Sequence, residues 1–407
     1  MPRLILIFAL LLGGGALADL RIFSSRFYQI HTDLEPGVAQ DLATRLDVMH
    51  EEYTRRLMRF GDKSAAPRVD AYLFARQSDY LRLAGAPLRS TGGVFIPSRN
   101  ALAAFHDEQG RDSLRRTLQH EAFHQFAANT IGHPLPMWLN EGMAQYYEEG
   151  LWTGDGFTIG QVPPRRVRQL QSDIRAGRLL DFSQFMKLTS DQWSSALGSR
   201  AVTRGATQYN QAWAMVHFLV NASDASGQPR FRALFIAMLQ RIHEGVDPEL
   251  AFSQQFSTNL KNFRERFDEW AISLEPTIEA TYIERQEVLG DMLLAMYEHD
   301  RSFTSMAEFR EAVRRARLRI DYSSGQIRWS SGDDTGLYFS KTDGSAFNTE
   351  ELFLQARRGA PLPDIVCETL PNTTLRTRFY RSGTRILHEM LFEPRLPGSA
   401  AGAPLRK

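Results

Sequence analysis

The segment His120-Glu121-Ala122-Phe123-His124 has the HExxH spacing of metal-dependent hydrolases. On a helix, residues four apart differ by only ~40° around the axis, so both imidazoles point the same way and can share one ion. Glu121 lies ~100° from His120, beside the metal rather than on it, where its carboxylate can take a proton from water. The spacing predicts a hydrolase with Glu121 as general base. The alternative is a polar helix face with two surface histidines.

A catalytic zinc site uses three protein ligands and leaves a fourth position open, so two histidines require a third partner. The segment Trp138-Leu139-Asn140-Glu141-Gly142-Met143-Ala144 follows the histidines. HExxH followed by WLNEGxA resembles the gluzincin peptidases, specifically their aminopeptidase-N-like branch. That resemblance implies that Glu141 is the third ligand of one Zn²⁺ per chain. The resemblance is a distant one, because the loop between the two motifs is shorter here. Taken alone, Glu141 also suits the positive N-terminal end of a helix.

Further site residues come from the same resemblance or from spacing. Tyr209-Asn210-Gln211-Ala212-Trp213-Ala214-Met215-Val216 is similar to the segment that begins an apolar helix with the family's catalytic tyrosine. This implies that Tyr209 donates a hydrogen bond to the oxyanion of the tetrahedral intermediate; the alternative is a packing tyrosine. The family's acidic residue seven positions after the zinc glutamate corresponds to Glu148, which would orient a histidine. Gln145, one turn after Glu141, is a second candidate, although a solvated helix face explains both residues.

The surrounding pattern predicts an α+β fold. The resemblance implies a zincin-like catalytic domain, residues 19–275, with a small N-terminal sheet followed by a helical lobe. Strand and helix periodicities predict the elements of this domain at Phe27–His31, Pro36–Arg59, Val69–Phe74, the hairpin Gly92–Phe105, Arg111–Thr130, Trp138–Glu149, from Pro163, Tyr209–Val220, Phe231–His243 and Leu260–Leu274. Arg165, Arg166 and Arg168 are expected on a solvated helix face. Residues 276–407 form an accessory region with a helical stretch, Ile278–Arg317, and two β-hairpins; the sequence identifies neither its role nor its partner.

The N-terminus has the pattern of a secretory signal peptide over residues 1–18. Arg3 precedes the apolar run Leu4–Leu12, and small residues at Ala16-Leu17-Ala18 suit cleavage after Ala18. The run is shorter than the ~20 residues of a spanning helix, so no transmembrane anchor is expected after cleavage; an uncleaved anchor is the alternative. The mature protein is expected in the periplasm or outside the cell.

The overall composition narrows the possible partners and cofactors. Lys plus Arg number 48 against 47 Asp plus Glu, which gives no case for a nucleic-acid partner. Cys367 is the only cysteine, so neither an internal disulfide nor a cysteine-rich zinc site is expected. A peptide or protein substrate is expected instead.

The resemblance also bears on where the substrate is cut. Aminopeptidases of this family bind the substrate's free amine with a glutamate in a GxMEN segment on the strand before the HExxH helix. The nearest stretch here, Gly92–Asn100, has no glutamate, and Glu108 is the most obvious residue that could supply the charge. We therefore expect an endopeptidase rather than an aminopeptidase. An inactive peptidase-like binding module and a zinc hydrolase of a non-peptide substrate are the alternatives.

Overall fold

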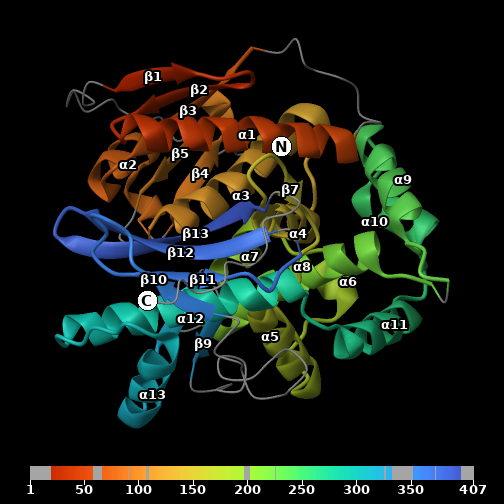
Figure 1. Cartoon of the computed structure of the whole chain (residues 1–407). Coiled ribbons are helices and arrows are strands. Elements are labelled where there is room, and N and C mark those ends of the chain that lie inside the picture. The colour runs from red at the N-terminus through yellow and green to blue at the C-terminus, as the bar shows by residue number, and fades with distance from the viewer. Residues whose placement is uncertain are drawn as a thin grey trace.

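A computed structural model describes residues 20–57, 67–89, 91–106, 110–196, 202–224, 226–324, 327–331, 352–371 and 373–395. Helices and sheets are mixed along the chain, which is compatible with the predicted α+β class (Figure 1). Among the described residues, the buried apolar side chains form one large cluster between Tyr28 and Ala271, a second one between Tyr282 and Phe379, and a small third one between Phe74 and Phe105. The N-terminal region and the C-terminal region therefore each have a core of their own.

A five-stranded sheet opens the N-terminal region. Its strands lie in the order β1 (Arg21–Ser24), β2 (Tyr28–Thr32), β3 (Val69–Phe74), β5 (Ala101–Phe105) and β4 (Gly93–Ile96). The three central strands are parallel, and β1 and β4 pair antiparallel at the two edges. The predicted hairpin is thus present, and it places β4 at the edge of the sheet, beside the helix that carries the histidines.

Helices form the rest of this region. Within the described residues they are α1 (Pro36–Arg56), α2 (Gln77–Ala84), α3 (Arg111–Thr130), α4 (Met137–Glu148), α5 (Pro164–Arg175), α6 (Phe182–Phe185), α7 (Ser190–Ser195), α8 (Val202–Asn221), α9 (Arg232–His243), α10 (Pro248–Gln255) and α11 (Leu260–Ser273). A short hairpin, β6 (Leu151–Trp152) with β7 (Phe157–Thr158), follows α4. Helix α4 packs against both α3 and α8 in the centre of the region (Figure 1).

Helix α8 corrects one expectation. It begins at Val202, so Tyr209 lies inside the helix rather than at its start. The polar residues Thr207 and Gln208 precede the apolar run and carry no amphipathic signal, yet both are buried. Tertiary packing therefore extends the helix through a stretch that its own sequence pattern does not mark as helical.

The C-terminal region consists of two helices followed by β-structure. Its elements are α12 (Ile278–Glu298), α13 (Met306–Ala316), the pair β8 (Asp321–Ser324) and β9 (Ile327–Ser330), and the antiparallel sheet β10 (Leu352–Gln355), β11 (Asp364–Cys367), β12 (Thr373–Ser382) and β13 (Arg385–Pro394). The expected continuous helix is interrupted after Glu298, where Asp300 adopts a positive φ of 58°. Strands β12 and β13 lie between α3 and α12 (Figure 1).

Among the described residues, no helix has the length and apolar character needed to cross a membrane. Two predictions lie outside the described residues: the signal peptide of residues 1–18 and the role of Glu108.

Candidate metal centre

The ligand atoms of His120, His124 and Glu141 converge on one point between α3 and α4. The two Nε2 atoms are 3.1 Å apart, and the Glu141 carboxylate oxygens lie 3.4 Å from Nε2 of His120 and 3.7 Å from Nε2 of His124. A tetrahedral zinc ion with bonds of ~2.0–2.2 Å holds its ligand atoms ~3.3–3.6 Å apart. The three side chains thus have the spacing that one zinc ion needs, and they form a candidate metal-binding group.

The second nitrogen of each imidazole is already engaged. Nδ1 of His120 lies 3.0 Å from Oε2 of Glu148, and Nδ1 of His124 lies 3.1 Å from Oδ1 of Asn140. Both partners offer acceptor oxygens, so each Nδ1 can keep a proton while its Nε2 gives up any proton and offers a lone pair to a cation. Two lone pairs and a carboxylate that face one another repel unless a cation lies between them. The donor set therefore fits a metal ion.

Electrostatics at this point favour positive charge. Burial acts to lower the pKa of His120, but hydrogen bonds with Glu141 and Glu148 outweigh it and raise that pKa well above its ordinary value. Burial acts to raise the pKa of Glu141, but the charge of His124 and the hydrogen bond with His120 outweigh it and lower the pKa. A carboxylate about nine-tenths buried is thus kept ionised among groups that bind a cation.

Glu121 stays outside this group. Its Oε2 accepts a hydrogen bond of 2.7 Å from the backbone N–H of Phe95, on edge strand β4. The bond holds one oxygen of the carboxylate against the edge strand. This position is compatible with the predicted general base, and the contact with Phe95 has no signal in the sequence.

An open cleft runs over the candidate ligands. Its free space, including space open to solvent, measures about 1280 Å³. One wall is β4 and the floor is α3, and the cleft is lined by Thr91, Gly93, Val94, Phe95, Pro97, His120, Glu121, His124, Ala127, Ala128, Gly132, His133, Pro134, Leu135, Asn140, Glu141 and Tyr209. The structure therefore places Tyr209 in the same cleft as His120, Glu121, His124 and Glu141.

The phenol of Tyr209 stays protonated at any physiological pH. Burial first, and then the charge of Glu141, raise its pKa far above the ordinary value. Its ring packs edge-on against Trp193, with centroids 5.1 Å apart. A protonated phenol at a cleft wall is a hydrogen-bond donor, and the packing holds its direction.

The two candidates for orienting a histidine differ in position. Glu148 contacts His120, as described above, whereas Gln145 donates to the backbone oxygen of Glu141 at 3.1 Å and accepts from Arg166 at 2.9 Å. Gln145 thus contacts neither imidazole. Asn140 orients His124 instead. Its place directly before Glu141 in the motif is the one sequence signal that points to this contact.

The prediction of a solvated face for the arginines at the start of α5 is wrong for two of them. Arg165 and Arg166 are buried rather than solvated, with 8% and 4% of their surfaces exposed. Both bind Glu149 at the end of α4: the nearest distances are 2.9 Å for Arg165 and 2.5 Å for Arg166. A run of arginines normally indicates a solvated face, but a buried carboxylate compensates these charges.

Fold and site together define a mixed α/β protein with a His/His/Glu group on two packed helices. Residues 115–227 match the model of a family that is described as a protein of unknown function, DUF1570. The matched segment contains both motifs and Tyr209. A comparison with curated proteins finds no match.

Proposed function

We propose that this chain is an exported zinc metallopeptidase that cleaves within peptide chains. The observation that carries the proposal is the convergence of two Nε2 atoms and one carboxylate at 3.1–3.7 Å, with a second carboxylate beside them in an open cleft. His120, His124 and Glu141 would hold the ion and leave one position free. Glu148 and Asn140 also support the proposal, because metal-binding histidines usually donate their second ring N–H to a carboxylate or a carbonyl oxygen.

A zinc ion bound there would polarise water and lower its pKa. Glu121, anchored by the N–H of Phe95, is placed to accept the proton from the attacking water and to pass it to the departing amine. The Tyr209 phenol, protonated and in the same cleft, donates a hydrogen bond to the oxyanion of the tetrahedral intermediate. Each residue therefore has a distinct role in hydrolysis.

The cleft suits the middle of an extended peptide. Its wall β4 is an edge strand, which can pair with an added strand through backbone hydrogen bonds. Among the described residues that line it there is no Lys or Arg, and Glu121 and Glu141 are the only carboxylates. If these two carboxylates serve as metal ligand and general base, a free N-terminal ammonium would have no further partner among the described lining residues, and its desolvation would oppose binding. These features support internal cleavage.

The experiment combines metal analysis with digestion. Mature protein, residues 19–407, is loaded with zinc, and the zinc content of wild type and His124→Ala is measured by mass spectrometry. We expect about one zinc per wild-type chain and little in the variant. Equal, near-zero content in both would contradict the metal site.

Digestion of a peptide library then tests the activity. A peptide that is cleaved is offered again with its N-terminus acetylated, and cleavage should persist at the same internal bond. Loss of cleavage on acetylation, with single residues released from the N-terminus, would show an aminopeptidase. A zinc-loaded protein that cleaves no peptide would favour a binding module or a hydrolase of another substrate.

A further inference from the structure

The C-terminal region is fastened to the helix that carries both histidines. Glu389 on β13 has a side chain that is 5% exposed, and its carboxylate lies 3.0 Å from both Arg111 and Arg115 of α3. One residue further, the N–H of Met390 donates to Asp112 of α3 at 2.7 Å. These contacts are largely shielded from solvent, and they hold the first turns of α3 against β13.

A second attachment reaches the helix that carries Glu141. Glu284 on α12 is fully buried, and it accepts hydrogen bonds from the backbone N–H of Arg165 at 2.9 Å and from Arg168 at 2.6 Å. The guanidinium of Arg165 binds both oxygens of Glu149, at 3.2 and 2.9 Å. Glu149 directly follows Glu148, the partner of His120. Polar contacts, joined covalently through Arg165 and through the Glu148–Glu149 peptide, thus connect α12 to a candidate metal ligand.

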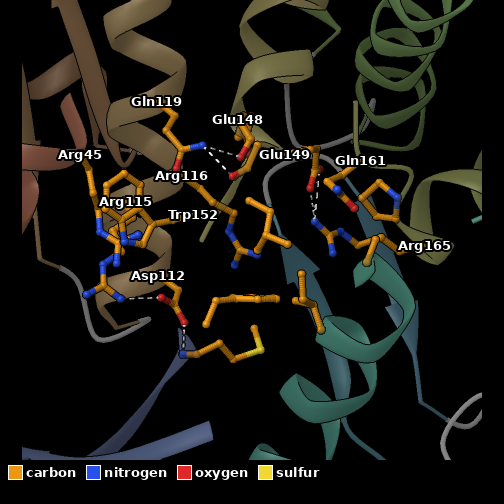
Figure 2. Close-up of a pocket in the computed structure, with 17 residues that line it drawn as sticks. Arg45, Asp112, Arg115, Arg116, Gln119, Glu148, Glu149, Trp152, Gln161 and Arg165 are labelled. Carbon is orange, nitrogen blue, oxygen red and sulfur yellow. Dashed lines mark hydrogen bonds and ion pairs between the residues drawn. The ribbon is translucent and has the colours of Figure 1, made fainter. Parts of the chain in front are cut away.

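A cavity with about 710 Å³ of free space, part of it open to solvent, lies between the two regions. Figure 2 shows Glu148 and Glu149 along one side of this cavity, and Arg165, which also lines it, reaching Glu149. The opposite wall is apolar and is formed by Ile283, Met390 and Phe392. The end of α4 is held from two sides: Gln119 of α3 donates to the backbone oxygens of residues 147, 148 and 150, and Arg165 and Arg166 of α5 bind the Glu149 carboxylate. The position of Glu148 therefore depends in part on the ion pairs that end at Glu149.

We infer that Glu284 is a positioning residue for the metal centre. Its carboxylate holds the start of α5, Arg165 in turn holds the end of α4, and the end of α4 sets Glu148 against His120. The C-terminal region is therefore part of the site's framework and not a separable binding module. This inference rests on the proposed function, because it presupposes that the ligands bind zinc.

The test uses the full mature chain and readouts other than turnover. Zinc affinity is measured by competition with a chromophoric chelator for wild type, Glu284→Gln and the control Glu311→Gln. Glu311 is an exposed residue of α13 in the same region, paired with Arg314 and Arg315. The visible spectrum of the cobalt-loaded proteins reports the geometry around the ion. Thermal midpoints report stability separately.

We expect Glu284→Gln to weaken zinc binding about tenfold, the lower end of the range for residues behind metal ligands, and to change the cobalt spectrum. The control should match wild type in both. If Glu284→Gln does not fold, the double variant Glu284→Gln/Arg168→Gln removes the facing charge as well and leaves no unpaired guanidinium there.

Unchanged affinity and an unchanged cobalt spectrum, even with a lower melting temperature, would overturn the inference and leave the proposed function standing. A wild-type protein that binds no zinc would contradict the proposed function itself. The two failures are therefore distinguishable in one set of measurements.

Discussion

Gly142 offers a sharp test of how the site is built, because it lies beside Glu141 at the crossing of α4 and α8. A Cβ atom at this position would stand 2.5 Å from the backbone oxygen of Ala212 and 2.8 Å from Cγ2 of Val216. The first contact is with backbone, which no rotamer change can relieve. Gly142→Ala must therefore push the two helices apart.

The expected cost follows from two opposing effects. Forcing an extra carbon into a packed core costs about 1–3 kcal/mol, and a clash with backbone belongs near the upper end, about 3 kcal/mol. Replacing Gly by Ala within a helix restores about 1 kcal/mol through helix propensity. The net loss is about 2 kcal/mol, which lowers the melting temperature of a domain of this size by about 4–8 °C. Zinc affinity should fall as well, because Glu141 moves with α4.

Thermal unfolding followed by circular dichroism measures the first effect, and chelator competition measures the second. Gly37→Ala is the matched control, because Gly37 lies exposed in the first turn of α1 and an added Cβ meets no atom within 4 Å. With no clash to oppose the gain in helix propensity, it should leave the protein as stable as wild type or more stable by up to about 1 kcal/mol. A Gly142→Ala protein that melts at or above the wild-type temperature would refute the close approach of α4 and α8.

Three further predictions concern catalysis and acid stability. Glu121→Gln should keep its zinc but lose ~10²–10⁴ in turnover, since an amide cannot accept the proton; normal kinetics would remove Glu121 from its role. Tyr209→Phe should lower kcat ~10²-fold with little change in KM, and an unchanged kcat would leave Tyr209 a packing residue. Burial raises the pKa of Glu149, but Arg165 and Arg166 outweigh it and lower the pKa to about 2. Because this pKa is lowered from the ordinary value of 4.5, the ionised Glu149 contributes stability that is present above about pH 4.5 and lost as the pH falls towards 2. The free energy of unfolding of the zinc-free protein, measured with urea across this pH range, should fall less steeply for Glu149→Gln than for wild type. Equal dependence on pH in the two proteins would contradict the ion pairs of Glu149 with Arg165 and Arg166.

Local patterns account for much of what the sequence predicts. The HExxH spacing places two imidazoles on one helix face because the helical repeat is a local property, and α3 presents them as expected. The β4–β5 and β12–β13 hairpins form between strands that are close in sequence, so alternation and turn residues were sufficient to predict them. Each of these features depends on residues that are neighbours along the chain.

Tertiary structure decided which groups meet across long separations. Asn140 and not Gln145 faces an imidazole, the N–H of Phe95 anchors Glu121, and Arg165 is buried. No periodicity reveals these contacts, because whether a charge is solvated or buried depends on the partner that compensates it. For Arg165, Glu149 accepts from the guanidinium and Glu284, 119 positions along the chain, accepts from the backbone N–H. A sequence pattern shows which residues share a face, whereas only the packed fold determines what that face meets.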